Sequence, residues 1–254
     1  MGFHVHSRGE RPRAVFLHGF SGDLHTWDAM WSLLGSDFSA LRYDLRGFGQ
    51  SIDNSGATFD HADDLLALLN VANIEVCDVI GVSMGGAIAL NFALNHPERV
   101  RSLSLISPGI VGWEWSQAWR ALWRPIVAKA REGAIDVARQ LWWQHPLFET
   151  TRNGPAGAAL CESIMRYSGE HWLHDYHKLM LPDIERLHEL RSRTLLLTGG
   201  RDFEDFRLIA DLTEASAPNL KRIDWPECGH LLQLEIPDIC AREILAFIGP
   251  ANPR

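Results

Sequence analysis

Gly81-Val82-Ser83-Met84-Gly85-Gly86 lies between two runs of opposite character. The run before it, residues 76–82, is apolar and rich in β-branched side chains, which favours a buried strand. The run after it, residues 87–94, is rich in alanine and leucine, which favours a helix. A Gly-x-Ser-x-Gly pattern therefore falls where a strand turns directly into a helix. Such a turn holds its serine at a strained backbone angle and needs glycine where side chains would collide.

Ser83 is accordingly a candidate nucleophile. The helix that follows begins just behind it, so free N–H groups and the helix dipole lie where they stabilise a negatively charged oxygen. The alternative interpretation is a glycine-rich turn that serves only to pack a helix on a strand. The rest of the chain favours the catalytic interpretation.

Composition sets limits on function. The 254 residues suffice for one large domain, or for one domain that carries an insert. A net charge of −8 argues against a nucleic-acid partner. No apolar run has the length of a membrane span or of a signal-peptide core, and the four cysteines form no Cys-x-x-Cys pair. We therefore expect a cytoplasmic protein that binds neither membrane nor nucleic acid and acts on a small molecule.

Seven segments show strand patterns, and helical patterns separate most of them. The predicted strands are residues 3–7, 14–17, 39–43, 76–82, 100–106, 194–198 and 220–225. This alternation predicts an α/β protein with a mainly parallel sheet that is covered by helices on both faces. In such sheets the ligand site lies at the carboxyl ends of the strands.

The strand rhythm is absent from residues 109–191, where seven of the ten tryptophans lie. We predict a core of residues 1–108 and 192–254, with residues 109–191 inserted as a helical cap over the site. Trp142 and Trp143 are adjacent, so on a helix they point about 100° apart. We assign both of them, together with Val82, to substrate binding. The apolar character of the cap predicts an apolar or aromatic substrate.

A serine nucleophile needs a base and a group that orients the base. His230, after the last predicted strand, is the candidate base. Asp202, after the strand at residues 194–198, is the candidate orienting acid, with Asp205 as a fallback. The order Ser, Asp, His is the one expected for this type of sheet. The backbone N–H groups of Met84 and Phe20 are the candidate oxyanion donors.

The chain resembles proteins of the α/β-hydrolase fold. Among them it is similar to serine carboxylesterases that have a helical cap. The segments that carry the resemblance are His18-Gly19-Phe20, Asp44-Leu45-Arg46-Gly47-Phe48-Gly49-Gln50-Ser51, the serine turn, Gly199-Gly200-Arg201-Asp202 and Gly229-His230. The resemblance implies a mostly parallel eight-stranded sheet flanked by helices. It also implies a Ser83–His230–Asp202 triad, an oxyanion hole from Phe20 and Met84, and no metal or organic cofactor.

Several reactions are compatible with this site. Serine at the turn argues against haloalkane dehalogenases and epoxide hydrolases, which use aspartate there. We favour a carboxylic-ester hydrolase that works through an acyl-enzyme; a lactonase, a carbon–carbon bond hydrolase and a non-catalytic small-ligand receptor are alternatives. Residues 18–23 and 142–148 are also similar to the menaquinone-pathway synthase that makes 2-succinyl-6-hydroxy-2,4-cyclohexadiene-1-carboxylate. That enzyme binds its anionic substrate with arginines, and here Ala87 stands at one of those positions, which leaves Arg120, Arg124 or Arg166 to substitute.

Two sets of histidines have structural interpretations. His171, His174 and His177 recur every three residues, but no carboxylate or other third ligand is placed to close a metal site. We interpret them as a solvated helix face. His18 is interpreted as a residue that shapes the loop of Phe20.

Overall fold

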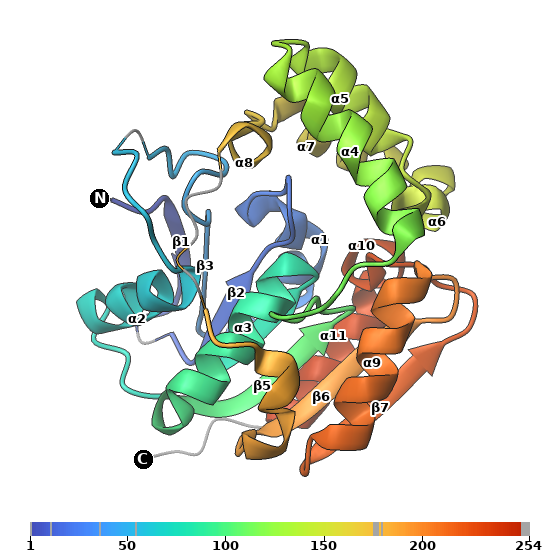
Figure 1. Ribbon diagram of the computed structural model, residues 1–254. Helices are drawn as coiled ribbons and strands as arrows, with labels where there is room; N and C mark the ends of the chain where they lie inside the picture. The colour runs from blue at the N-terminus through green and yellow to red at the C-terminus, as the bar shows by residue number, and fades with distance from the viewer. Residues whose placement is uncertain are drawn as a thin grey trace.

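A seven-stranded sheet forms the centre of the computed structural model (Figure 1). The structure describes residues 2–10, 12–35, 37–53, 55–174, 178 and 180–249. The strands are β1 (Val5–Arg8), β2 (Ala14–Leu17), β3 (Ala40–Tyr43), β4 (Cys77–Val82), β5 (Val100–Ile106), β6 (Arg193–Gly199) and β7 (Leu220–Trp225). Their order is β1-β3-β2-β4-β5-β6-β7, and every pair is parallel except β1 with β3. The parallel strands therefore end together at one edge of the sheet.

The sheet has one strand fewer than the resemblance implies. The seven strands of the described chain fall in the seven segments whose patterns predicted strands. β1 already forms the antiparallel edge beside β3, and only residues 2–4 of the described chain precede it. The expectation of eight strands was therefore wrong for the described residues, which form seven.

Helices cover both faces of the sheet, as the alternating pattern predicts. In Figure 1, α2 (His61–Val71), α3 (Met84–Asn95) and α9 (Glu204–Ser216) lie on one face. On the other face lie α1 (Asp28–Leu33), α10 (Leu232–Glu235) and α11 (Pro237–Ile248), while the 3-10 turns η1 (Leu24–Trp27) and η2 (Pro97–Arg99) join elements of the core. β2 and β4 are buried along their whole length, because both faces of a central parallel strand are covered. Among the described residues, no helix combines the length and the apolar character needed to cross a bilayer.

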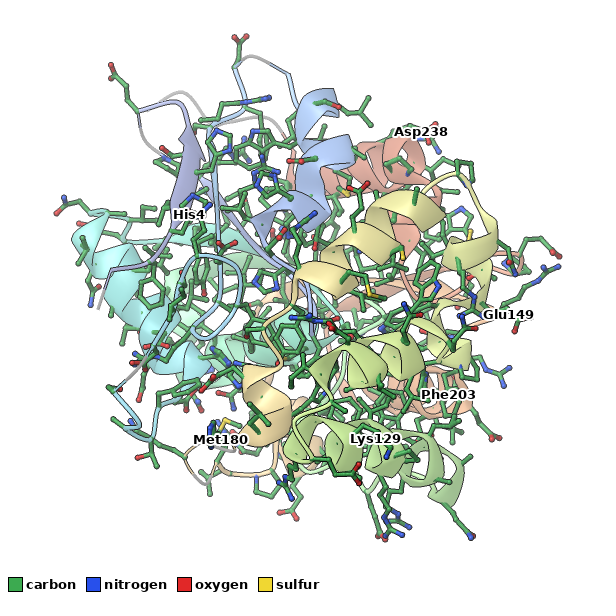
Figure 2. The ribbon with its side chains drawn as sticks, turned by 90° about the horizontal axis from the view of Figure 1, so that it is seen from above. His4, Lys129, Glu149, Met180, Phe203 and Asp238 are labelled. Carbon is green, nitrogen blue, oxygen red and sulfur yellow. The ribbon has the colours of Figure 1, made fainter. Side chains whose placement is uncertain are left out.

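Most of the chain between β5 and β6, residues 117–173, forms a separate group of helices above the carboxyl edge of the sheet, whereas residues 183–189 lie lower, against α3 and α9 (Figure 1). We call residues 109–191 the helical insert. Its elements are α4 (Gln117–Arg131), α5 (Ile135–Trp143), η3 (Pro146–Phe148), α6 (Glu149–Asn153), α7 (Gly157–Arg166), α8 (Glu170–Leu173), η4 (Asp183–Glu185) and η5 (Leu187–Glu189). Seen from above, its green and yellow ribbons cover the middle of the molecule (Figure 2). Trp119, Trp142 and Trp172 are buried and form much of its apolar interior.

Candidate active site

Ser83 lies at the turn between β4 and α3, with φ 54° and ψ −118°. This left-handed conformation is strained for any residue that has a side chain. A Cβ atom at Gly85 would collide with the carbonyl oxygens of Leu17 and His18, and one at Gly81 would collide with Gly85 O. The Ser83 side chain makes no capping hydrogen bond to α3 and lines a cavity instead. The backbone therefore presents the hydroxyl to the space under the helical insert.

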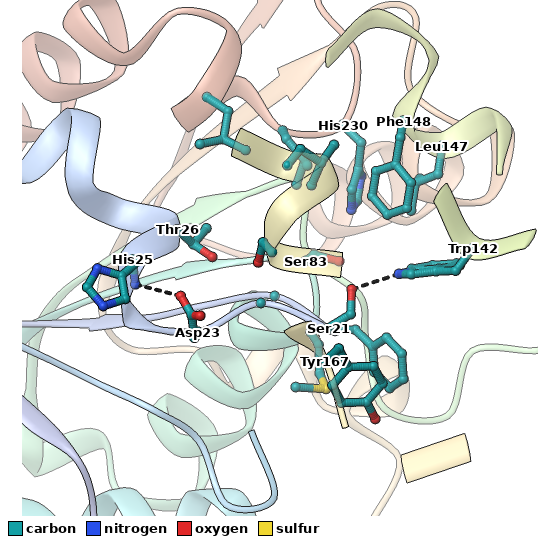
Figure 3. Close-up of a pocket in the computed structure, with 18 of the residues that line it drawn as sticks. Ser21, Asp23, His25, Thr26, Ser83, Trp142, Leu147, Phe148, Tyr167 and His230 are labelled. Atoms are coloured by element: carbon teal, nitrogen blue, oxygen red, sulfur yellow. Dashed lines mark hydrogen bonds between the residues drawn. The ribbon is translucent and has the colours of Figure 1, made fainter. Parts of the chain in front are cut away.

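His230 and Asp202 form a buried pair at the ends of neighbouring loops. His230 Nδ1 lies 2.9 Å from Oδ2 and 3.0 Å from Oδ1 of Asp202. Phe203 N–H also donates to Asp202 Oδ1 at 2.7 Å, which fixes the carboxylate. Because the carboxylate accepts a hydrogen bond from Nδ1–H, the lone pair of the neutral imidazole lies on Nε2. Nε2 has no hydrogen-bond partner in the described chain, and His230 lines the same cavity as Ser83 (Figure 3).

The loop after β2 passes close over the serine. β2 and β4 pair so that Leu17 lies opposite Gly81, which brings Phe20 and Met84 to the same cavity. A Cβ atom at Gly19 would lie only 3.3 Å from Ser83 Cβ. The two N–H groups predicted as oxyanion donors are thus on adjacent segments beside Ser83.

His18 holds the shape of this loop. Its Nε2 accepts a hydrogen bond from Leu45 N–H at 3.0 Å, and its Nδ1 donates to Gly19 O at 2.8 Å. Complete burial lowers the pKa of His18, so the ring is neutral and these two roles are fixed. This arrangement matches the interpretation of His18 as a structural residue.

A cavity of about 1680 Å³ lies between the sheet edge and the helical insert. It exceeds the roughly 300–1,000 Å³ of an ordinary small-molecule site. Ser83 and His230 form part of its wall (Figure 3). Much of the rest of the wall is aromatic: Phe20, Trp115, Trp119, Trp123, Trp142, Phe148, Tyr167 and Phe206.

The structure brings one of the three predicted substrate-binding residues to the cavity. Trp142 lines it, but its indole N–H donates to Ser21 Oγ at 2.7 Å (Figure 3). Trp143 is not among the lining residues, because the adjacent position on α5 points its ring elsewhere, to where the Arg152 guanidinium lies 5.7 Å from the ring centroid. Val82 is completely buried within β4 and does not line the cavity either.

Two of the three candidate arginines reach the cavity. Arg120 of α4 and Arg166 of α7 line it, whereas Arg124 does not. Arg166 also pairs with Asp23 of the core, with a nitrogen–oxygen distance of 3.3 Å. The sequence identified these arginines as candidates, but their spacing did not predict which face of each helix would be turned toward the site.

Asp205, the fallback acid, has a different role in the structure. It accepts hydrogen bonds from Trp113 Nε1 at 2.9 Å, Ser116 N at 2.8 Å and Ser116 Oγ at 2.6 Å. Burial raises the pKa of this carboxyl, but the bonds from Ser116 and Trp113 outweigh it and lower the pKa overall. Asp205 therefore ties the start of the helical insert to α9, and Asp202 is the carboxylate that contacts His230.

The interpretation of a solvated histidine face was wrong for His171. Its Nε2 lies 3.0 Å from Arg46 O, and its ring stacks on Phe48 with centroids 4.4 Å apart. The helix α8 is short, so His171 points to the core instead of to solvent. His177 lies outside the described residues.

Comparisons with known proteins agree with this fold. A family model described as alpha/beta hydrolase fold matches residues 12–133. The solved structure of MenH from S. aureus superposes with a TM-score of 0.80 at 23% identity, covering 97% of both chains, and at that identity the likeness shows the fold alone. The chain has the α/β-hydrolase fold.

The curated proteins that this chain resembles have different activities. A dihydrolipoyllysine-residue acetyltransferase component of the acetoin cleaving system from Pseudomonas putida is 27% identical over 97% of this chain, and the chain spans 65% of that longer protein. The pimeloyl-[acyl-carrier protein] methyl ester esterase of Nitrosomonas europaea is 26% identical over 92% of this chain and 95% of its own. The 2-succinyl-6-hydroxy-2,4-cyclohexadiene-1-carboxylate synthase of Klebsiella pneumoniae is 36% identical over 54% of this chain and 55% of its own.

Proposed function

We propose that this protein is a serine hydrolase that cleaves a carboxylic ester of an apolar or aromatic small molecule. The observation that carries the proposal is the buried His230–Asp202 pair, whose unpartnered Nε2 faces a cavity that also holds the strained Ser83. The methyl ester esterase among the relatives supports ester chemistry for this fold. In this proposal the helical insert acts as the cap, and its aromatic side chains bind the apolar part of the substrate.

The mechanism follows from the protonation state of the pair. Ser83 Oγ attacks the ester carbonyl carbon while His230 Nε2 takes the hydroxyl proton. The negative oxygen of the tetrahedral intermediate accepts hydrogen bonds from Phe20 N–H and Met84 N–H. The bond to the leaving alcohol then breaks, and His230 gives its proton to the alcohol oxygen. His230 next deprotonates a water that hydrolyses acyl-Ser83, while Asp202 stays ionised and holds the imidazole.

Hydrolysis of p-nitrophenyl esters of rising acyl length tests this proposal, with the Ser83→Ala variant measured beside the wild type. We expect turnover that Ser83→Ala lowers by about 10⁴ or more, with an unchanged thermal unfolding midpoint. The acyl length of greatest kcat/KM then measures how much of the cavity the acyl group uses. A folded wild type that turns over none of these esters, or equal turnover by Ser83→Ala, would overturn the proposal.

A second candidate function is a lyase that acts on an anionic substrate, like the synthase among the relatives. The observation that favours it is the presence of Arg120 and Arg166 at the cavity. Guanidinium groups in a partly dry site form strong, often bidentate, bonds to carboxylates. In this protein they would supply the positive charge that Ala87 does not.

The two candidates differ in their response to substrate charge. Mono-p-nitrophenyl succinate carries a carboxylate, and p-nitrophenyl pentanoate is a neutral ester of similar length. If the natural substrate is anionic, the succinate has the higher kcat/KM, and Arg120→Gln or Arg166→Gln raises its KM about 10-fold without the same effect on the pentanoate. Preference for the neutral ester in all three proteins would exclude the second candidate.

A further inference from the structure

We propose that Trp142 is a positioning residue of the candidate oxyanion loop, residues 18–23. Its indole N–H holds Ser21, and through Ser21 it holds the N–H of Phe20 in place. The oxyanion donor is then fully ordered only when the helical insert is seated on the core. This inference rests on the proposed function for its catalytic consequence, but its structural part is tested separately.

The hydrogen bond joins two segments that are far apart in the chain. Trp142 Nε1–H, at the end of α5, donates to Ser21 Oγ at 2.7 Å, and the two residues are 121 positions apart (Figure 3). Both are almost completely buried, with 2% of Trp142 and 4% of Ser21 exposed. Loss of the indole N–H would leave the Ser21 hydroxyl without this donor.

The acceptor sits on a strained part of the loop. Ser21 has φ 59°, a conformation that residues with side chains seldom adopt. Gly22 N–H donates to Gly19 O at 3.2 Å and closes a tight turn around Phe20 and Ser21. A strained conformation persists only where its surroundings hold it, and Trp142 supplies a directed contact for that purpose.

The ring of Phe20 is held by the same part of the molecule. Four aromatic rings of the helical insert surround it, with centroid distances of 5.3 Å for Trp123, 5.8 Å for Trp142, 5.4 Å for Tyr167 and 6.1 Å for Trp172. Phe48 is the core residue that contacts it, at 5.7 Å. Packing alone is tolerant of small shifts, whereas the bond from Trp142 to Ser21 has a fixed direction. The indole N–H therefore gives the loop a directed contact from the helical insert, in addition to the contacts that His18 makes within the core.

Oxyanion donors act because they are ordered before the reaction begins. Loss of one donor typically costs about 10²–10³ in kcat, and a small displacement costs part of that. Trp142→Phe keeps an aromatic ring at the cavity and removes only the N–H. We expect it to lower kcat about 10-fold while KM changes less than two-fold, because substrate packing remains.

Two further variants isolate the bond. Ser21→Ala removes the acceptor and should lower kcat by a similar factor, and the double variant Trp142→Phe/Ser21→Ala should be no slower than either single one. Trp113→Phe is the matched control, because it also removes an indole N–H bond between insert and core, to Asp205, without touching the loop. It should leave kcat at the wild-type value.

Amide hydrogen exchange of residues 18–23 gives a readout that needs no activity. We expect faster exchange of this loop in Trp142→Phe and Ser21→Ala than in the wild type and Trp113→Phe. A boronic acid, which forms a tetrahedral adduct on serine, should bind more weakly to the first two variants by the factor lost in kcat.

The outcomes distinguish failure of the positioning role of Trp142 from failure of the proposed ester hydrolysis. Wild-type exchange and wild-type kcat in Trp142→Phe overturn the inference, as does an equal loss of kcat in Trp113→Phe. If the folded wild type hydrolyses no ester, the proposed function fails. In that case the exchange data alone decide whether Trp142 orders the loop.

Discussion

The sheet edge and the helical insert both form the cavity, but they are held in different ways. Ser83, Asp202 and His230 lie on the segments that follow β4, β6 and β7. Backbone geometry holds these segments in place, through the strained turn at Ser83, two glycines that admit no side chain and the parallel register of the strands. The insert, in contrast, is held by stacked aromatic rings and a few side-chain hydrogen bonds to the core.

Several of those bonds have a carboxylate as the acceptor. Buried or half-buried carboxylates accept from partners across the boundary, as Asp205 does from Trp113 and Glu235 does from Thr150 at 2.7 Å. A single substitution can remove a side-chain bond of this kind. The strained turn at Ser83, in contrast, does not tolerate substitution of its glycines. In the proposed function, the sheet edge carries out the chemistry and the helical insert selects the substrate.

Asp202 and Asp205 give the largest expected contrast between the two regions. Asp202→Asn replaces the ionised carboxylate with an amide whose NH₂ can donate to Nδ1 and favour the wrong His230 tautomer, so kcat on the best ester should fall about 10⁴-fold. Asp205→Asn should leave kcat within about three-fold but lower the free energy of unfolding by about 1–3 kcal/mol, because its bonds to the insert weaken. Steady-state kinetics and urea unfolding of both variants measure this. Equal losses of kcat would show that the two regions are not separable in this way.

The sequence was informative wherever the signal is local. The strands and the Gly-x-Ser-x-Gly turn depend on neighbours within a few residues. Local sequence patterns therefore located them, and with them the positions of Ser83, Asp202 and His230 after predicted strands. The structure places Asp202 and His230 in contact, as the sequence predicted.

Contacts across the boundary could not be predicted. The bond from Trp142 to Ser21 spans 121 positions and depends on how the insert sits on the core. The same holds for Trp143, whose direction is set by the exact rotation of α5, and for the reach of Arg120 to the cavity. His171 looked solvated because its partner, Arg46 O, comes from a distant loop.

Two glycines test the difference in backbone constraint. Gly85→Ala places a Cβ against Leu17 O and His18 O, so we expect a loss of about 3 kcal/mol in unfolding free energy and of most activity. Gly133, in the turn between α4 and α5, has φ 83° but open space around it. Gly133→Ala should cost only about 1 kcal/mol and leave kcat unchanged. Similar unfolding midpoints for the two variants in urea would contradict the contrast.

Asp183 gives a pH-dependent test of the boundary. Burial raises the pKa of this carboxyl to about 6, although bonds from Asn91 Nδ2 at 2.9 and 3.0 Å and the charge of Arg186 partly oppose it. Because the folded pKa exceeds the unfolded value, the folded state binds more protons between about pH 4 and 6, and stability falls as pH rises through that window. Asp183→Asn does not titrate there. Its unfolding free energy relative to wild type should therefore rise by about 2 kcal/mol from pH 4 to pH 7.

Urea unfolding at the two pH values measures this difference. The matched control is Asp136→Asn in α5, whose carboxylate is 92% exposed and should show little change relative to wild type. A difference between Asp183→Asn and wild type that is the same at both pH values would show that Asp183 has no raised pKa.

Trp143 gives the smallest expected effect. Its ring contacts the Arg152 guanidinium instead of the cavity, so Trp143→Phe should cost about 0.5 kcal/mol of stability and change KM less than two-fold. Thermal unfolding and ester kinetics check both values. A large rise in KM would restore the sequence-based assignment of Trp143 to substrate binding.

Covalent labelling of the nucleophile tests the central claim most directly. A fluorophosphonate reacts with an activated serine whatever the natural substrate is, and intact-protein and peptide mass spectrometry locate the adduct. The account predicts one adduct per chain, on Ser83, that is absent from Ser83→Ala and strongly slowed in His230→Ala. No adduct on the folded wild type, or an adduct on another residue, would contradict it.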